Sequence, residues 1–326
     1  MSKDPLVHLH DWKVYSNRAR SIVEPSIRAA ESFIQTQHAA IRYTCHKYIQ
    51  QTTLTYYDTY RGHGKPSVPE PEVDTPFAVR LLPRSITNQL SDKVKLARRI
   101  AEHNLFEHAP KTYFSLDEAI QSGGDPNRLL FVKLRSGTRG EHVSCVKYSD
   151  LASLEWSPDH IIQEGVNNPA LFMNRKTVFR FYIFIFDGAV YISKHGVVIV
   201  HGEDYDPNKT DYKIHVQHNG EGAEPIKFPL AHLPYSHTWM DALKNLTRAL
   251  LPVLEVARKD SSLFRYLLIG ADGIPCDDGK VRLIEMNAHP SLVKAPMIEP
   301  VYMPVFSSMM LMVVPGLNDN TWIRIA

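Results

Sequence analysis

Residues Lys280–Leu292, with the sequence KVRLIEMNAHPSL, alternate in the manner of a β-strand and carry two polar side chains among apolar ones. Alternation predicts one face formed by Val281, Leu283, Glu285 and Asn287, and an opposite face formed by Arg282, Ile284 and Met286. A carboxylate and a carboxamide are costly to bury on an apolar strand unless each has a partner. Hard oxygen donors on a rigid strand are what a Mg²⁺ ion bound to phosphates requires. This stretch therefore predicts a metal site on one face of a sheet.

Just upstream, Asp278-Gly279 is a strong signal for a two-residue hairpin turn. With these residues at the turn centre, position 277 pairs with position 280, and counting back places Asp272 opposite Glu285. Asp272, Glu285 and Asn287 would then converge on one face as three oxygen donors. Pro275 would interrupt the ladder unless its strand lies at an edge or the loop is longer. The alternative is a solvated hairpin, which the apolar flanks LLIG and LIEM disfavour.

The overall composition is that of an ordinary globular protein. Of the 326 residues, 44% are hydrophobic and 22% are charged, which suits two or three domains with a large core. The formal net charge of +2 creates no global field that would favour nucleic acid or an anionic membrane as a partner. Three widely separated cysteines, Cys45, Cys145 and Cys276, fit reduced thiols in an intracellular protein and form neither a disulfide framework nor a zinc pattern.

Targeting and membrane signals are weak. The N-terminal segment MSKDPLVHLHDW lacks an apolar region like that of a signal peptide. The longest nearly uncharged run, Val301–Leu317, contains two prolines and is too short to span a bilayer, so we expect a buried C-terminal helix there. We therefore expect a soluble, cytoplasmic protein that binds neither nucleic acid nor a membrane.

The first part of the chain has helical periodicity from Ser26 to about Tyr60, with Ser26 as the expected N-cap. Four prolines and two glycines in Gly62–Pro76 indicate a linker. A short strand follows, and then a helix that Ser91-Asp92 would cap. Lys93 lies in the first turn of this helix, which is the unfavourable end for a cation. An anion that holds Lys93 would explain its position, although an ordinary surface lysine is the simpler alternative.

Two further segments place cations at strand positions. Arg128–Lys133 is predicted to be a buried strand that ends in Lys133, and the small-residue loop after it could direct backbone N–H groups at phosphates. A plain hairpin is the alternative interpretation. Arg175–Asp187 is apolar on both faces and predicts a central strand. Arg180 interrupts one of these faces, with Lys176 on the same face, and a buried arginine needs an anion from the protein or from a ligand.

Downstream segments complete the expected element order. We expect strands at His160–Gln163, Ala189–Ser193 and Val197–Val200, and a long amphipathic helix over Trp239–Val256. Pro252 should kink this helix or mark its end.

From about residue 85 to residue 312, these motifs together resemble the ATP-grasp enzymes, and within them tubulin tyrosine ligase and its relatives. The resemblance is carried in order by LSDKVKLARRI, APKTYFSLDEA, VKLRSGTRGEHV, IIQEGV, NPALFMNRKTVFRFYIFI, YISKHGVVIVHGEDYDP and LIEMNAHPSL. The sequence departs from the family on the acceptor side. Glu164 stands where the family usually has Lys, Val178 where it has Asp, and Lys194 where it has Arg. The ATP machinery is therefore better supported than any tubulin specificity.

The resemblance implies an α+β (α/β) ATP-grasp fold, in which the nucleotide is held between two mixed or antiparallel β-sheets, with a helical N-terminal region. It divides the chain into residues 1–76, the N-terminal helical region and Pro-rich linker; residues 77–126, a central domain; and residues 127–326, the nucleotide-binding and catalytic domain. It also implies ATP and Mg²⁺ as cofactors.

The same resemblance assigns site residues. Mg²⁺ would be held by Asp272, Glu285 and Asn287. ATP would be bound by Lys93, Lys133, Ser136, Gly137, Thr138, Arg139, Gly140, Gln163, Glu164, Val166 and Lys176. Lys176 and Arg180 would be catalytic and would face the γ-phosphate or the acceptor carboxylate.

The implied activity is that of an ATP-dependent carboxylate–amine ligase, which forms an amide or peptide bond through an acyl phosphate. Its partners would be a small-molecule, peptide or protein carboxylate and an amino acid or other amine. One alternative is an ATP-grasp kinase for a small molecule such as an inositol phosphate, which His195, His201, His215 and Lys213 keep open. Another is a nucleotide-binding scaffold without activity, which the complete Asp272, Glu285 and Asn287 set disfavours.

Overall fold

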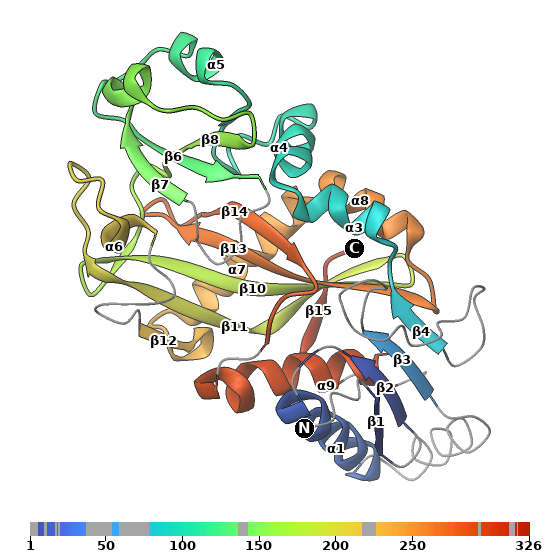
Figure 1. The fold of residues 1–326 in the computed structure, drawn as a ribbon. Helices are drawn as coiled ribbons and strands as arrows, with labels where there is room; N and C mark the ends of the chain where they lie inside the picture. Colours follow the sequence, from blue (N-terminus) through green and yellow to red (C-terminus); the bar gives the residue numbers. More distant parts are fainter. Residues whose placement is uncertain are drawn as a thin grey trace.

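The computed structural model describes residues 6–9, 12–16, 18, 20–36, 54–58, 78–135, 143–216, 226–292, 295–312, 317 and 319–326. Within these ranges, two β-sheets and the helices packed on them build the molecule (Figure 1). The larger sheet has eleven strands and the smaller has four. The smaller sheet stands over one end of the larger one in the view of Figure 1.

The large sheet is mixed, and its strands follow one another across the molecule. The order is β1 (Leu6–Leu9), β2 (Trp12–Ser16), β3 (Leu54–Asp58), β4 (Ala78–Leu81), β13 (Arg265–Pro275), β10 (Arg175–Phe186), β11 (Ala189–Asp204) and β12 (Ile226–Pro229). Three more strands pair off this path: β14 (Val281–Ala288) with β13, β15 (Trp322–Arg324) with β11, and β9 (Leu171–Phe172) with β10.

The small sheet is antiparallel, in the order β5 (Thr112–Tyr113), β8 (His160–Glu164), β6 (Leu129–Leu134) and β7 (Val143–Lys147). Helix α5 (Leu116–Gln121) and the 3₁₀ helix η1 (Tyr148–Ser153) cover one of its faces. Their apolar side chains share a core with Leu130, Val132 and Ile162. The opposite face of the small sheet is directed toward the large sheet.

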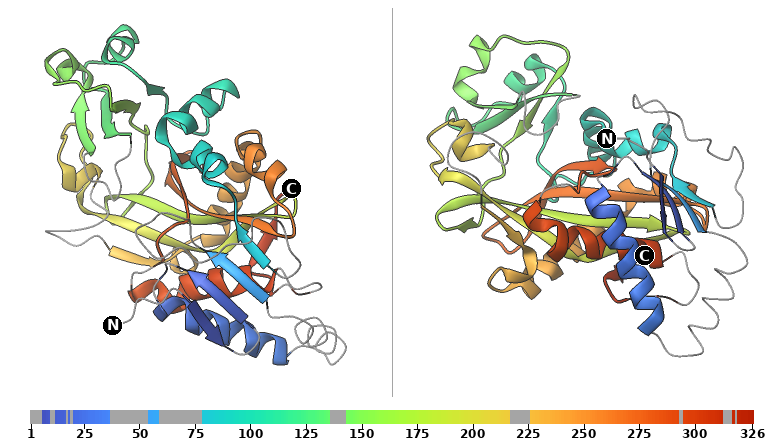
Figure 2. Two further views of the ribbon diagram at one scale, coloured as in Figure 1. Left: turned by 45° about the vertical axis from the view of Figure 1, so that its right-hand side comes forward. Right: turned by 60° about the horizontal axis from the view of Figure 1, so that its bottom comes forward.

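Helices cover both faces of the large sheet (Figure 2). Helix α1 (Arg20–Thr36) and helix α9 (Met303–Leu311) contact each other and share a core on one face. The other face is covered by α3 (Arg84–Ser91), α4 (Lys93–Glu102), α7 (Ser236–Ala249) and α8 (Leu251–Asp260). The remaining short helices are α6 (Tyr212–His215), η2 (Leu230–His232), η3 (Ala295–Met297) and the π-helical turn η4 (Ile298–Tyr302). No helix in the described ranges is both long and apolar enough to cross a bilayer.

Strand β10 is central, as its sequence predicted. It pairs with β11 on one side and with β13 on the other. Phe179, Phe181, Ile183 and Ile185 enter the core under α7 and α8. Val178, Tyr182, Phe184 and Phe186 enter the core under α1 and α9. Arg180 lies on this second face, so the alternation alone placed it correctly.

The N-terminal region differs from the predicted long helix. Helix α1 begins at Arg20, tolerates Pro25 close to its N-terminus, and is described only as far as Thr36. Ser26 is therefore not an N-cap but a fully buried residue inside the helix. Leu54–Asp58 forms β3, a strand between the parallel neighbours β2 and β4, because its Thr and Tyr residues suit a pleated surface. The N-terminal region is thus mixed rather than helical.

Other element predictions met smaller differences. The strands expected at Ala189–Ser193 and Val197–Val200 are one long strand, β11, with an irregularity in its pairing to β10. The helix expected at Trp239–Val256 breaks at Leu250, and Pro252 lies in the first turn of α8, where a missing N–H costs little. The C-terminal run contains the buried helix α9. The linker Gly62–Pro76 lies outside the described residues, and the domain boundaries remain predictions.

Candidate active site in the cleft between the two sheets

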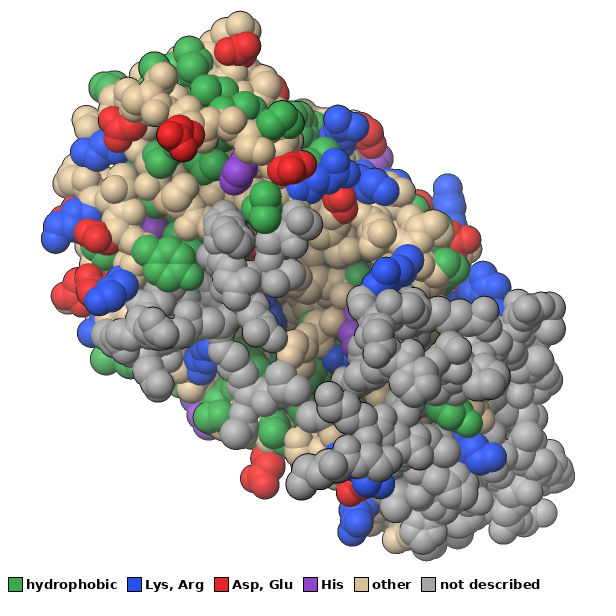
Figure 3. Space-filling model, viewed as in Figure 1, with side chains coloured by type: hydrophobic (Ala, Val, Ile, Leu, Met, Phe, Trp, Pro, Cys, Tyr) green, Lys and Arg blue, Asp and Glu red, His purple; other side chains and the backbone are tan. Residues whose placement is uncertain are grey.

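A cleft of about 660 Å³ lies between the small sheet and the large sheet. Strands β6, β7 and β8 line the cleft from the small sheet, and β10, β11, β12, β13 and β14 line it from the large sheet. Most of the predicted site residues that the structure describes line this cleft or the smaller pocket next to it. Over the described part of the face in Figure 3, acidic and basic side chains are interspersed.

Strands β13 and β14 carry the predicted metal ligands. Asp272 lies directly opposite Glu285, as the hairpin count predicted, and Asn287 lies opposite Gly270. The route differs from the prediction, because the turn has three residues rather than two. The N–H of Cys276 bonds the carbonyl of Lys280, and Gly279 adopts a φ of +75° at the end of the loop. The longer turn would by itself shift the pairing by one position. A register shift between Asp272 and Gly273 leaves Ile284 as an extra residue in β14, and this restores the pairing of Asp272 with Glu285.

That register shift is a bulge, and it reverses the faces of β14. Val281, Leu283 and Met286 enter the core under the helices, whereas Ile284, Glu285 and Asn287 line the cleft. The prediction that Val281 and Leu283 share a face with Glu285 is therefore wrong, because unbroken alternation does not hold across a bulge.

Pro275, which was expected to interrupt the ladder unless its strand lay at an edge or the loop was longer, is accommodated in β13. Pro275 opposes Val281 next to a hydrogen-bonded pair, where its missing N–H is not needed.

The anion that Arg180 needs is Asp272, its neighbour across β10 and β13. The Arg180 Nε atom donates to Oδ1 at 2.6 Å, and one terminal nitrogen donates to Oδ2 at 2.5 Å. Arg180 keeps about 20% of its side chain exposed, whereas Asp272 keeps 5%. Burial opposes the charge on Arg180, but the facing Asp272 carboxylate outweighs it and raises the pKa of the guanidinium.

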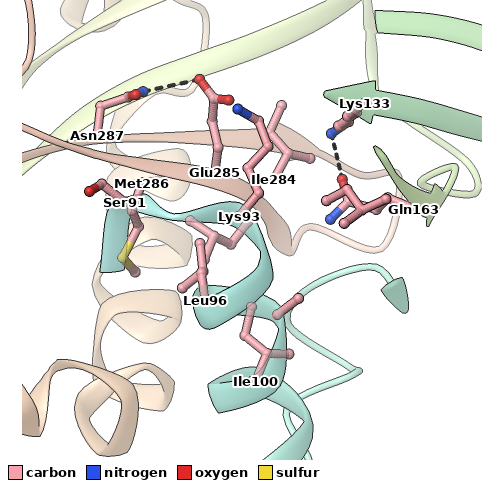
Figure 4. Close-up of a pocket in the computed structure, with 13 residues that line it drawn as sticks. Ser91, Lys93, Leu96, Ile100, Lys133, Gln163, Ile284, Glu285, Met286 and Asn287 are labelled. Atoms are coloured by element: carbon pink, nitrogen blue, oxygen red, sulfur yellow. Dashed lines mark hydrogen bonds between the residues drawn. The ribbon is translucent and has the colours of Figure 1, made fainter. Parts of the chain in front are cut away.

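Glu285 is held in its charged form by three neighbours. Asn287 Nδ2 donates to its Oε1 at 3.0 Å, and the Lys93 side chain extends toward the carboxylate (Figure 4). Burial would raise the pKa of Glu285, but the Lys93 ammonium, the Asn287 hydrogen bond and Arg180 lower it to about 2. Glu285 is therefore an anion close enough to interact with the charge of Lys93, which agrees with the interpretation that an anion lies at this helix N-terminus. Asp92, not Ser91, is the N-cap of that helix and accepts from the N–H groups of residues 94 and 95.

Lys133 faces the cleft from β6 in a different kind of environment. Its Nζ donates to the side-chain oxygen of Gln163 at 2.6 Å (Figure 4), and Gln163 is in turn bonded to Thr112. Burial lowers the pKa of Lys133 to about 8, with Lys93 adding to the effect and Glu285 opposing it. The hydrogen bond to a neutral amide leaves the ammonium poorly compensated.

Lys176 is the most deeply placed cation of the cleft, at 4% exposure. Its Nζ donates to the carbonyl of His215 at 3.2 Å and lies 4.6 Å from the centre of the Phe131 ring. Burial lowers the pKa of Lys176 to about 8, and the nearby Lys133 contributes. Both interactions involve neutral groups, so neither of these two contacts supplies a counter-charge to the Lys176 ammonium.

The strand predicted to lie along the adenine ring has mixed outcomes. Gln163 and Val166 are buried and line the cleft. Glu164 also lines the cleft, and its carboxylate accepts hydrogen bonds from Tyr113 at 2.6 Å and from Arg128 at 3.1 Å within the small sheet. Ser136, Gly137, Thr138, Arg139 and Gly140 lie outside the described residues, and their phosphate-binding role remains a prediction.

Sequence reasoning did not single out several residues that line the cleft, among them Lys227, His289 and Tyr302. Lys227 opposes Ile199 across β11 and β12, so the two side chains share the cleft face. His289 has a φ of +61°, an uncommon conformation that directs the chain away from the end of β14. Neither placement follows from the local sequence, because both depend on pairing between distant strands.

The donor set at β13 and β14 fits Mg²⁺ that is also bound by phosphates. Asp272 and Glu285 offer carboxylate oxygens, and Asn287 offers an amide oxygen. Mg²⁺ sites of this kind use one or two carboxylates and take their other ligands from water and phosphate. The described residues contain no group of three or more His, Cys, Asp or Glu side chains that could hold a metal ion.

Comparison with known proteins supports the fold. No protein-family model and no curated protein matches the sequence. Among solved structures, the chain is similar to the C-terminal domain of K. lactis Pby1, an ATP-grasp enzyme that interacts with the mRNA decapping enzyme Dcp2. The two share 13% identity with a TM-score of 0.62, over 97% of this chain and 98% of that domain. The chain therefore has the fold of an ATP-grasp domain, as its motifs predicted.

Proposed function

We propose that this protein is an ATP-dependent carboxylate–amine ligase of the ATP-grasp type. The observation that carries the proposal is the convergence of two charge sets across one cleft. Lys133 and Lys176 enter with mostly neutral partners, and Asp272 and Glu285 enter with Asn287 beside them. An ATP-grasp fold with phosphate-seeking cations opposite Mg²⁺-type oxygen donors supports an ATP-dependent reaction.

The proposed roles follow from these positions. Lys133 and Lys176 would bind the phosphates of ATP, with Lys93 supporting them from α4. Gln163 and Val166 would flank the adenine. When bound, Mg²⁺–ATP supplies an activated phosphoryl group, and the Mg²⁺ would be held by Asp272, Glu285 and Asn287.

Arg180 would neutralise the reacting carboxylate or the phosphoryl group that it receives. The substrate carboxylate would attack the γ-phosphorus of ATP and release ADP, which gives an acyl phosphate, and an amine would then displace phosphate to give the amide. Neither step needs a nucleophile from the protein. Positioning and charge neutralisation supply the catalysis.

The kinase alternative loses much of its support in this geometry. Of its four proposed phosphate contacts, only His201 and His215 line the cleft. Burial and the nearby Lys176 lower the pKa of His215 to about 4, so this ring is neutral at physiological pH. His201 bonds the carbonyl of Ile214 at 3.0 Å, and Lys213 pairs with Glu203 at the surface.

Hydroxylamine trapping tests the proposal directly. The protein is incubated with Mg²⁺–ATP and panels of carboxylic acids, amino acids and phosphorylated alcohols, and the mass of each product is recorded. A ligase forms a hydroxamate from the correct acid when hydroxylamine replaces the amine. ATP consumption with a phosphorylated alcohol as the stable product, and no hydroxamate, would replace the ligase by the kinase.

A further inference from the structure

The predicted catalytic arginine and a predicted metal ligand are bound to each other. The contact is two-point, with both oxygens of Asp272 engaged by the Arg180 guanidinium at 2.6 and 2.5 Å. Asp272 is almost fully buried, so this pair is screened little by solvent. In this state Arg180 cannot present the same nitrogens to a substrate carboxylate or phosphate.

Electrostatics disfavours a state in which Asp272 holds both partners. A divalent cation at the Asp272 and Glu285 oxygens would lie a few bond lengths from the guanidinium, in a poorly solvated cleft where like charges repel strongly. The Arg180 side chain has room to move away from Asp272, since it is partly exposed and lines the cleft. A bound phosphate or carboxylate there would replace the anion that it gives up. Neither buried charge is then left without a partner at the end of the exchange.

We infer that Arg180 and the divalent cation are successive partners of Asp272, so that Arg180 becomes available to the acceptor only after metal and nucleotide have bound. This inference rests on the proposed function and adds an order of binding to it. Asp272 stays bound to Arg180 until the metal ion binds. The released guanidinium can then bind the anionic group of the acceptor. Arg180 thereby prevents metal-free protein from capturing the acceptor unproductively.

Binding of Mn²⁺ alone to the nucleotide-free protein tests the exchange. The Arg180→Gln variant removes the internal competitor, and it should bind Mn²⁺ at least about tenfold more tightly than wild type. The matched control is Arg282→Gln, which breaks the 2.9 Å ion pair with Asp278 at the tip of the same hairpin and leaves Asp272 untouched. The control should bind Mn²⁺ as wild type does. The double variant Arg180→Gln, Asp272→Asn should lose the gain.

Two results would overturn the exchange. One is Mn²⁺ binding by Arg180→Gln that is equal to or weaker than that of wild type, which would mean that the pair assists the metal. The other is an undiminished gain in the double variant, which would place the ion elsewhere. A non-hydrolysable ATP analogue with Mg²⁺ is titrated in parallel into wild type. If wild type binds the nucleotide analogue but Arg180→Gln shows no increase in Mn²⁺ affinity, this inference alone is wrong. If wild type does not bind the nucleotide analogue, the proposed function is wrong as well.

A measurement on wild type covers the case in which Arg180→Gln does not fold. The Nε–H of Arg180 donates to Asp272, so its ¹⁵N-resolved proton signal should exchange slowly with solvent in the free protein. Arg180→Lys assigns this signal by removing it. Addition of Mg²⁺ with the non-hydrolysable analogue should move the signal and accelerate its exchange. An unchanged signal at saturating ligand would show that Arg180 never leaves Asp272.

Discussion

The cleft contains two sets of buried charges with opposite kinds of partner: the lysine wall, formed by Lys133 of β6 and Lys176 of β10, and the carboxylate wall, formed by Asp272 of β13 and Glu285 of β14. Among the described residues, Lys133 on β6 and Lys176 at the start of β10 have hydrogen bonds to an amide oxygen and to a backbone carbonyl, and burial lowers the pKa of each to about 8. On the side of β13 and β14, Asp272 is matched by Arg180, and the pKa of Glu285 falls to about 2 beside Lys93. The lysines of the first set are bonded to neutral groups, whereas the carboxylates of the second set lie beside the cations Arg180 and Lys93.

This difference indicates what each wall contributes when the cleft is filled. If the proposed function holds, the lysine wall would gain stability from a bound phosphate, because the phosphate would supply an anion to Lys133 and Lys176. The carboxylate wall gains only if a stronger cation replaces Lys93 or Arg180, which a divalent metal can do. The comparison therefore predicts large catalytic effects at the carboxylate wall, and effects on binding and stability at the lysine wall.

The largest effect is expected for Glu285→Gln, which removes one metal-ligand charge with little change in volume. Turnover should fall at least about a thousandfold while the fold stays intact. ATP cleavage at millimolar Mg²⁺ and a thermal unfolding scan measure the two quantities. Asp277→Asn, at the exposed tip of the same hairpin, is the matched control and should be fully active. Near-normal turnover in Glu285→Gln would disprove the metal assignment.

Arg180→Lys should give the next largest effect, because it retains a positive charge but loses the planar two-point geometry. The value of kcat should fall about a hundredfold, while the affinity for ATP stays within about threefold. Steady-state kinetics with the identified acceptor and calorimetry with the ATP analogue separate the two. A loss of nucleotide affinity without a loss of kcat would assign Arg180 to ATP binding instead.

Lys133→Ala should weaken ATP binding by about thirtyfold, which corresponds to ~2 kcal/mol. The reason is that the ammonium is held beside a neutral amide and has no substitute in a small apolar side chain. Isothermal calorimetry measures the affinity. Lys147→Ala, on the neighbouring strand β7, is the control and should bind ATP normally. Equal affinities in the two variants would make Lys133 an ordinary strand-end lysine.

The affinity for ATP should also fall as the pH rises through 8. Below this pH, Lys133 and Lys176 are protonated in the free protein, whereas above it they must take up protons before phosphates bind. Between pH 8 and pH 9 the affinity should drop by up to about tenfold for each lysine. Calorimetry in buffers of different ionisation enthalpy reports the proton uptake. Nucleotide binding without proton uptake at pH 8.5 would contradict the lowered pKa values.

The smallest effect concerns stability. Lys176 has a folded pKa below its value of 10.5 in model compounds, so its charge disfavours folding below pH 8. This penalty should fade as the pH rises from 8 toward 10.5. Lys176→Met should therefore raise the free energy of unfolding at pH 7 by about 1 kcal/mol, with a smaller gain at pH 9.5. Denaturant unfolding at both pH values tests this, and a variant that is less stable than wild type at pH 7 would refute it.

Several features of this protein were determined by local sequence alone. The alternation of Arg175–Asp187 fixed both faces of the central strand, because side chains on a strand alternate whatever lies around it. The Pro252 break was predictable because proline lacks a backbone donor. The facing of Asp272 and Glu285 was also predicted, although a longer turn and a bulge cancelled to produce it.

The tertiary structure decided which partner each buried charged side chain has. Arg180 and Asp272 are 92 residues apart, and only the pairing of β10 with β13 brings them together. Lys133 finds Gln163 because β6 pairs with β8, and Lys93 approaches Glu285 because α4 packs beside β14. A sequence shows that a buried charge needs a partner, since desolvation is a local cost. The identity of the partner depends on strand order and register, which long-range packing selects.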